Sequence, residues 1–118
     1  GQLTARFLER EGYTVVVETS GQAGIDRYLS DNPDLIVMDV AMPGMSGFEA
    51  SAHIRAAQRE QKRPHVPILI LTAYARSFFM SVGTEVGIDS FLTKPIMPEK
   101  LIEHIHQFLN DSPASLGG

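Results

Sequence analysis

Short apolar runs alternate with amphipathic segments along this chain. Residues 14–19 (TVVVET) form a β-branched run that favours a strand. Residues 34–39 (DLIVMD) and 67–71 (PILIL) are apolar at nearly every position, which is typical of strands buried on both faces of a parallel sheet. Residues 90–93 (SFLT) predict a short last strand.

The segments between these strands have helical spacing and recognisable ends. Ser20 is a plausible N-cap, Asn32-Pro33 breaks the helix that follows it, and Ser46 with Glu49 has the spacing of a capping box. Pro98 suits the first turn of a final helix. Helices are predicted over residues 2–11 and 76–86, from the Ser20 cap to the break at Asn32-Pro33, from Ser46 to near Glu60, and from Pro98 to about Leu109.

Alternating strands and helices predict one α/β domain. Such a pattern implies a doubly wound parallel sheet with right-handed crossovers and helices on both faces. The chain has 118 residues, a length suited to a single core, so we expect one domain over residues 1–110. Residues 111–118 (DSPASLGG) should be a flexible tail or a linker stub.

Composition narrows the classes of function. The net charge of −4 gives no broad cationic surface, so we expect no direct binding to nucleic acid, and no apolar run is long enough to span a membrane. The absence of cysteine suits the cytoplasm, which is the expected location. The four histidines show no metal-ligand arrangement, and we expect them on the surface: His53, His65, His104 and His106. A basic cluster should be solvated charge at a helix end: Arg55, Arg59, Lys62 and Arg63.

Three polar residues stand at the ends of three predicted strands: Asp39, Thr72 and Lys94. Ligands of open parallel sheets bind beyond the carboxyl ends of the strands, near the point where strand order reverses. A carboxylate, a hydroxyl and an ammonium at that edge would suit phosphoryl transfer, with Asp39 as nucleophile. Lys94 could neutralise the phosphoryl charge, and its bond to Pro95 permits a cis peptide.

The strings MDVAMPGMSGFE, LTAYA and FLTKP, in this order at strand ends, resemble the receiver domain of two-component response regulators. The resemblance covers Gly1 to about Leu109 and implies a flavodoxin-like fold with five strands. It also implies a bacterial phosphorelay protein in which a histidine kinase or a phosphotransfer protein phosphorylates Asp39. Thr72 and Lys94 match the family's catalytic hydroxyl and lysine. Thr72 with Phe91 matches its switch pair, although Phe91 could equally be constitutive core.

The resemblance implies a Mg²⁺ site that this sequence holds only in part. Asp39 and the backbone carbonyl of Ala41 match two ligands, whereas the family's acidic pair ends a first strand that is absent from residues 1–118. One carboxylate and one carbonyl are a poor Mg²⁺ site alone. We expect that the sequence omits residues of a longer protein. The alternative is an altered sheet, because loss of a central strand should leave unpaired edges inside it.

Other positions that match the family concern access to the phosphoryl group and contacts with protein partners. Ala41 and Tyr74 should line the approach to the phosphoryl group, and we expect slow loss of phosphate because alanine cannot position an attacking water. Phe78, Phe79 and Met80 cannot all face one core, so they could form a partner or self-association face. Equally, the helix could be short or tilted and bury most of this apolar surface. Homodimerisation would use the family's fourth helix, fifth strand and fifth helix.

Two functions remain open at this level. The first is a phosphorylation-dependent switch that catalyses at most its own phosphorylation and dephosphorylation. The second is a receiver-like interaction or dimerisation module that takes no phosphate. An aspartyl-phosphate phosphatase of the dehalogenase type is disfavoured, because such enzymes need a second aspartate where this chain has Ala41.

Overall fold

A computed structural model describes residues 12–39, 45–74 and 87–110 of the chain. Its strands are β1 (Val15–Glu18), β2 (Leu35–Asp39), β3 (Ile68–Thr72) and β4 (Ser90–Thr93). Its helices are α2 (Gly21–Asp31), α3 (Met45–Glu60) and α5 (Pro98–Asn110). Each agrees with a predicted element to within one or two residues at its ends. The predicted helices over 2–11 and 76–86 and the tail 111–118 lie outside the described residues.

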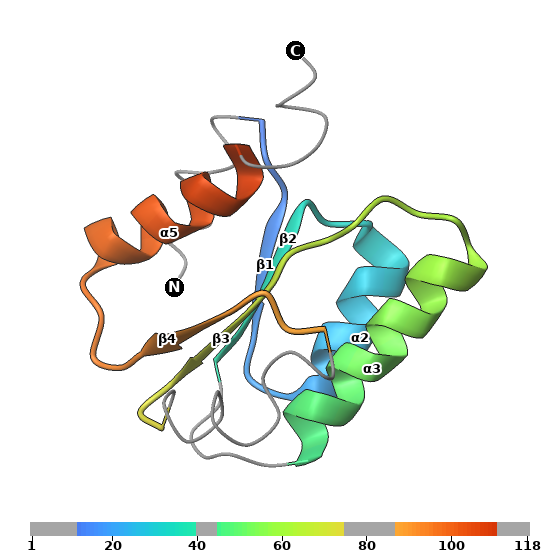
Figure 1. The fold of residues 1–118 in the computed structure, drawn as a ribbon, viewed down its shortest axis with the longest axis horizontal. Coiled ribbons are helices and arrows are strands. Elements are labelled where there is room, and N and C mark those ends of the chain that lie inside the picture. Colours follow the sequence, from blue (N-terminus) through green and yellow to red (C-terminus); the bar gives the residue numbers. More distant parts are fainter. Residues whose placement is uncertain (1–11, 40–44, 75–86, 111–118) are drawn as a thin grey trace.

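The strands form one parallel sheet in the order β1-β2-β3-β4 (Figure 1). The prediction of unpaired edges inside the sheet is wrong for the described strands, because β1 pairs directly with β2 from Val15 opposite Leu35 to Glu18 opposite Met38. This pairing corresponds to the altered sheet that was the alternative. This pairing satisfies backbone groups that a missing neighbour would leave unbonded. The order of these strands also never reverses, so the carboxyl edge of the sheet has no switch point among them.

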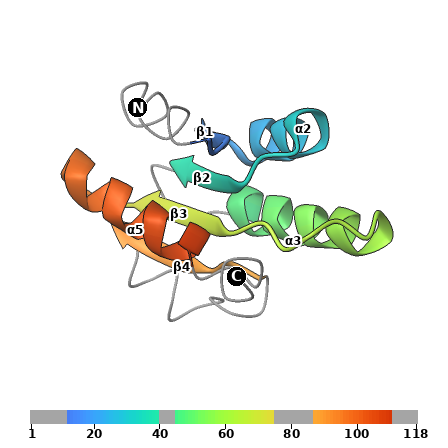
Figure 2. The same ribbon diagram turned by 90° about the horizontal axis from the view of Figure 1, so that it is seen from above.

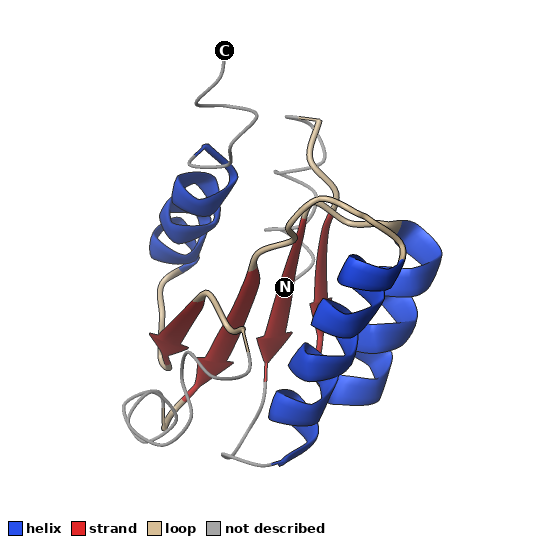
Figure 3. Ribbon diagram, turned by 45° about the vertical axis from the view of Figure 1, so that its right-hand side comes forward, coloured by secondary structure: helices blue, strands red, loops and turns tan. Residues whose placement is uncertain are grey.

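Helices cover both faces of the sheet, as the alternating pattern predicted. Figures 2 and 3 show α2 and α3 on one face and α5 on the other. Right-handed crossovers between strands that advance in one direction place their helices on the same face, which accounts for α2 and α3 lying together. No helix within the described ranges has the length and apolar character needed to cross a membrane.

The alternation of side chains along the strands divides the core into two clusters. Met38 and Ile70 belong to the cluster under α2 and α3, whereas Val37 and Leu71 belong to the cluster under α5. Both faces of β2 and β3 are therefore apolar because both are buried. The α5 side of the second cluster consists of every fourth residue of that helix: Leu101, Ile105 and Leu109.

The helix ends show which local signals decide the structure. The Ser20 hydroxyl accepts a hydrogen bond from the Ala23 amide at 3.2 Å, so the predicted N-cap is confirmed. Helix α3 begins at Met45, which places Ser46 inside the helix rather than at the predicted cap. The last turn of α3 closes with bonds from the Lys62 amide to the Arg59 carbonyl and from the Arg63 amide to the Gln58 carbonyl. This pattern is a Schellman motif with Lys62 at its left-handed position.

We predict that Lys62→Gly stabilises the protein. Lys62 has φ of 53°, a conformation that glycine adopts without the steric penalty of a Cβ. The free energy of unfolding should rise by about 0.5–1 kcal/mol, measured by urea denaturation. Lys62→Ala is the matched control, because it removes the charge and keeps the Cβ. Equal stabilisation by both variants would contradict the backbone explanation.

Tyr28 of α2 is buried in the first cluster, and its hydroxyl has no hydrogen-bond partner among the residues that the structure describes. The Arg63 guanidinium lies over the ring, 4.1 Å from its centroid. Because an unsatisfied buried hydroxyl costs about 1–3 kcal/mol, Tyr28→Phe should leave the free energy of unfolding unchanged or raise it by about 1 kcal/mol. Thermal or urea unfolding of the variant checks this, with the exposed Tyr74→Phe as control. A clear loss of stability in Tyr28→Phe would show that the hydroxyl is bonded.

Candidate functional site

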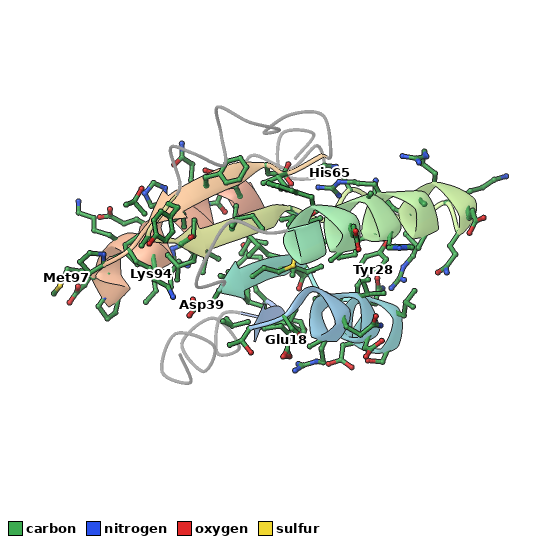
Figure 4. All side chains as sticks on the ribbon, turned by 90° about the horizontal axis from the view of Figure 1, so that it is seen from below. Glu18, Tyr28, Asp39, His65, Lys94 and Met97 are labelled. Atoms are coloured by element: carbon green, nitrogen blue, oxygen red, sulfur yellow. The ribbon has the colours of Figure 1, made fainter. Side chains whose placement is uncertain are left out.

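The carboxyl edge of the sheet brings together the three residues that the sequence singled out. Asp39 ends β2, Thr72 ends β3, and Lys94 directly follows β4. The Lys94 ammonium forms an ion pair with Oδ1 of Asp39. About a third of each side chain is exposed, at 35% for Lys94 and 32% for Asp39. Figure 4 shows both side chains at the same edge of the sheet. The pair is therefore preformed and open to solvent.

Thr72 is fully buried at the end of β3, the strand next to Asp39, and both its hydroxyl and its backbone carbonyl accept hydrogen bonds. Its hydroxyl oxygen accepts a hydrogen bond from the Tyr74 amide at 3.2 Å. Its backbone carbonyl accepts one from the Lys94 amide at 2.9 Å, and the Lys94-Pro95 peptide is cis. Thr72 thus links the end of β3 to the residue that pairs with Asp39.

The site has the chemical parts that the acceptance of an anion requires. A partly exposed carboxylate can act as a nucleophile, and the ammonium at its side favours negative charge on whatever group it receives. The Lys94 ammonium has three donors, so it can bond a phosphoryl oxygen while it remains near the Asp39 carboxylate. The arrangement suits transfer of a compact anionic group onto Asp39.

The remaining predicted site residues divide into described and undescribed ones. Phe91 lies in β4 and packs, partly buried, against the cluster under α2 and α3. Tyr74, two residues after the end of β3, is 47% exposed. The other residues named for access and for partners lie outside the described residues: Ala41, Phe78, Phe79 and Met80.

The described residues alone do not complete a Mg²⁺ site. Among them, no three histidine, cysteine, aspartate or glutamate side chains come together. Glu18 is the acidic residue at the end of the neighbouring strand, but it pairs with Met38, so its side chain and that of Asp39 leave opposite faces of the sheet. Glu18 is engaged there by Arg27 at 3.0 Å. Asp39 therefore has no second described carboxylate beside it, whereas Mg²⁺ favours an octahedral set of oxygen ligands.

A polar network that the sequence did not predict lies at the opposite end of β3 and β4. Arg55 was expected in a solvated cluster, yet only 8% of it is exposed, and its side chain donates to the carbonyls of Gly87 and Val66 and to Asp89. Burial lowers the pKa of the Arg55 guanidinium, and the Asp89 carboxylate opposes this shift. A Cβ at Gly87 would lie 2.9 Å from the Arg55 stem, so the glycine leaves room for it.

The other members of that basic cluster have different surroundings. Arg63 is also not simply solvated, because it stacks on Tyr28 and bonds Oδ1 of Asn32 at 2.7 Å. Arg59 and Lys62 are exposed, as expected. The only local signals for the network were Gly87 and Asp89 just before the last strand, and neither identifies Arg55 as a partner.

Comparison with known proteins points to one family. The model of the response regulator receiver domain matches residues 1–106. Response regulator ArlR of Staphylococcus haemolyticus is 36% identical over 116 residues, which is 95% of this chain and 50% of that protein. The alkaline phosphatase synthesis transcriptional regulatory protein PhoP of Bacillus subtilis is 34% identical over 105 residues, 89% of this chain and 42% of that protein. The chain thus spans about half the length of these curated relatives.

Solved structures agree with this assignment. A LuxR-family two-component response regulator from Aurantimonas is 31% identical with a TM-score of 0.67, covering 98% of this chain and 84% of that one. The chemotaxis protein CheY4 of Vibrio cholerae is 29% identical with the same TM-score, 0.67, covering 90% and 86%. The receiver domain of the sensor histidine kinase PA1611 from Pseudomonas aeruginosa, solved with magnesium in its active-site cleft, is 25% identical with a TM-score of 0.69, covering 93% and 85%.

Proposed function

The chain belongs to the response regulator receiver domain family, and on that premise we propose that Asp39 accepts a phosphoryl group from a histidine kinase or a histidine phosphotransfer protein. The observation that carries the proposal is the ion pair between Lys94 and Asp39 at the carboxyl edge of the sheet. The family and its response-regulator relatives place the chain in two-component signalling. The assignment of Asp39 as the acceptor residue is our proposal.

The transfer is a single displacement at phosphorus. A carboxylate oxygen of Asp39 forms an O–P bond as the N–P bond of the donor phosphohistidine breaks, and the leaving nitrogen keeps the bonding pair and takes one proton from solvent. The ammonium of Lys94 stands beside the carboxylate and offsets the negative charge that arrives with the phosphoryl group. Mg²⁺ is the cofactor expected for the family, but its ligands are incomplete among the described residues.

Phosphorylation would then act as a switch through Thr72. In this structure the hydroxyl oxygen accepts the Tyr74 amide proton. A phosphoryl group on Asp39 would offer acceptor oxygens to the Thr72 hydroxyl, which shifts the balance between two arrangements of the segment after β3. Phe91, packed at the edge of the core in β4, would change its packing in the same shift. Such a shift would alter the surface that a partner, or a second copy of this chain, contacts.

Intact mass spectrometry tests the acceptor directly. The full-length natural protein is incubated with phosphoramidate and MgCl2, and we expect one added phosphoryl group that is lost on treatment with hydroxylamine, as acyl phosphates are. Asp39→Asn should show no adduct. Asp34→Asn is the matched control, because Asp34 is exposed at the other end of β2 and should not affect the adduct. An adduct that survives in Asp39→Asn would place the phosphoryl group elsewhere.

The second candidate function is an interaction module that takes no phosphate. It predicts no adduct in the full-length protein with either a small phosphodonor or a phosphorylated histidine kinase. Failure with both donors would exclude the switch in favour of this module.

A further inference from the structure

Strand β4 is a short edge strand that is fixed at both of its ends. Among the described strands it pairs only with β3, from Leu69 opposite Ser90 to Thr72 opposite Thr93. At its beginning, the Asp89 amide donates to the Ile68 carbonyl at 3.0 Å, and at its end the Lys94 amide donates to the Thr72 carbonyl at 2.9 Å. Because strand pairing can slip by whole residues, something must define which residue of β4 faces which residue of β3.

The carboxylate of Asp89 makes the contacts that define this register. Its Oδ2 accepts from the Ile68 amide and from Nη2 of Arg55, each at 2.7 Å, so one oxygen joins the first residue of β3 to helix α3. Its Oδ1 lies 2.8 Å from Nε2 of His65. With 18% of its side chain exposed, Asp89 is held in a partly buried, charge-assisted network.

Arg55 fixes this carboxylate to the body of the domain. Its guanidinium donates twice to the Gly87 carbonyl, at 3.0 and 2.8 Å, and once to the Val66 carbonyl at 2.7 Å. These carbonyls lie just before β4 and just before β3. A planar guanidinium bonded in this way fixes the starts of β3 and β4 relative to helix α3.

From these contacts we propose that Asp89, held by Arg55, is a positioning residue for Lys94 at the far end of the same strand. A slip of one residue moves the strand by about 3.3 Å and turns each side chain to the opposite face. Lys94 would then lose its place against the Asp39 carboxylate. The inference rests on the proposed function for its effect on phosphorylation, whereas its effect on the Lys94–Asp39 pair is independent of that function.

A double-mutant cycle separates positioning from general stability. Asp89→Asn should slow phosphorylation of Asp39 by phosphoramidate about tenfold, since small misplacements of reacting groups have effects of this order or larger. In the Lys94→Ala background the same substitution should change the rate less than twofold, because the residue through which it acts is gone. Equal losses in both backgrounds would overturn the proposal.

A spectroscopic readout covers the case in which the protein takes no phosphate. The side-chain carboxyl carbon of Asp39, observed by ¹³C NMR, should shift in Lys94→Ala and should shift in the same direction in Asp89→Asn. His65→Gln is the matched control, because His65 contacts the other oxygen of Asp89, its side chain is 50% exposed, and its loss leaves the Arg55 and Ile68 bonds in place. An unchanged Asp39 signal in Asp89→Asn would refute the positioning role even in a fully phosphorylatable protein.

Arg55→Lys provides a second variant in case Asp89→Asn does not fold. A lysine keeps the charge but carries its three donors on one nitrogen, so it lacks the planar fork whose separate nitrogens bond Gly87, Val66 and Asp89. In this variant the ¹³C signal of the Asp39 carboxyl carbon should shift in the same direction as in Asp89→Asn. The size of the shift should follow the number of Arg55 hydrogen bonds that are lost. A folded Arg55→Lys protein with the parent signal at Asp39 would count against the proposal, and absence of a phosphoryl adduct in the parent protein would count only against the proposed function.

Discussion

The Arg55→Ala variant is expected to unfold with a free energy about 3 kcal/mol lower than that of the parent protein. Only 10% of the Arg55 side chain is exposed, and the substitution leaves Asp89 without its cation and two carbonyls without this donor. Removal of one partner from a buried ion pair is strongly destabilising because the remaining charge stays poorly solvated. Urea denaturation followed by circular dichroism measures the change.

Arg59→Ala is the matched control for this prediction. Arg59 lies one helical turn further along α3 and is exposed, so its loss should change the free energy of unfolding by no more than about 0.5 kcal/mol. If the two variants were equally stable, the Arg55 network would be a surface interaction of little energetic value, and the positioning of β4 would need another cause.

The Lys94→Ala variant is expected to accept a phosphoryl group about a hundredfold more slowly than the parent protein. Loss of one charged donor that faces the developing negative charge typically has an effect of about 10²–10³ on rate. Because the ion pair with Asp39 is about one-third exposed, stability should change much less than reactivity. The measurement is the time course of the phosphoryl adduct at saturating phosphoramidate.

Lys100→Ala controls for the general loss of a positive charge. Lys100 lies in α5 with 67% of its side chain exposed and pairs only loosely with Glu103, at 3.4 Å. The parent rate should persist in this variant. A Lys94→Ala rate within threefold of the parent rate would mean that another group neutralises the phosphoryl charge.

The elements were predictable because their signals are local. The β-branched and apolar runs placed all four described strands, and Ser20 placed the start of α2 correctly. The end-of-strand positions of Asp39 and Lys94 then sufficed to predict their meeting, since parallel strands bring their carboxyl ends to one edge. The proposed chemistry of the site rests on position and residue type together.

The features that escaped prediction depend on distant partners. Arg55 and Arg59 are the same residue type, four positions apart on one helix, yet one is buried and the other exposed. The difference arises from Asp89, which is 34 residues away from Arg55 in the sequence. Direct pairing of β1 with β2 is likewise determined by tertiary structure, because the apolar pattern of a strand does not specify which strand lies next to it.

The order of the described strands has a consequence for biosynthesis. Each of them pairs only with the strand before or after it in the chain, so on the ribosome every new strand can meet a partner that has already emerged. Helices α2 and α3 are translated between these strands, so they can cover their face of the sheet while the sheet grows. Helix α5 is translated after the other described elements. Until it emerges, the face formed by Leu35, Val37, Leu69 and Leu71 lacks this helix, and the nascent chain should interact most strongly with chaperones during that interval.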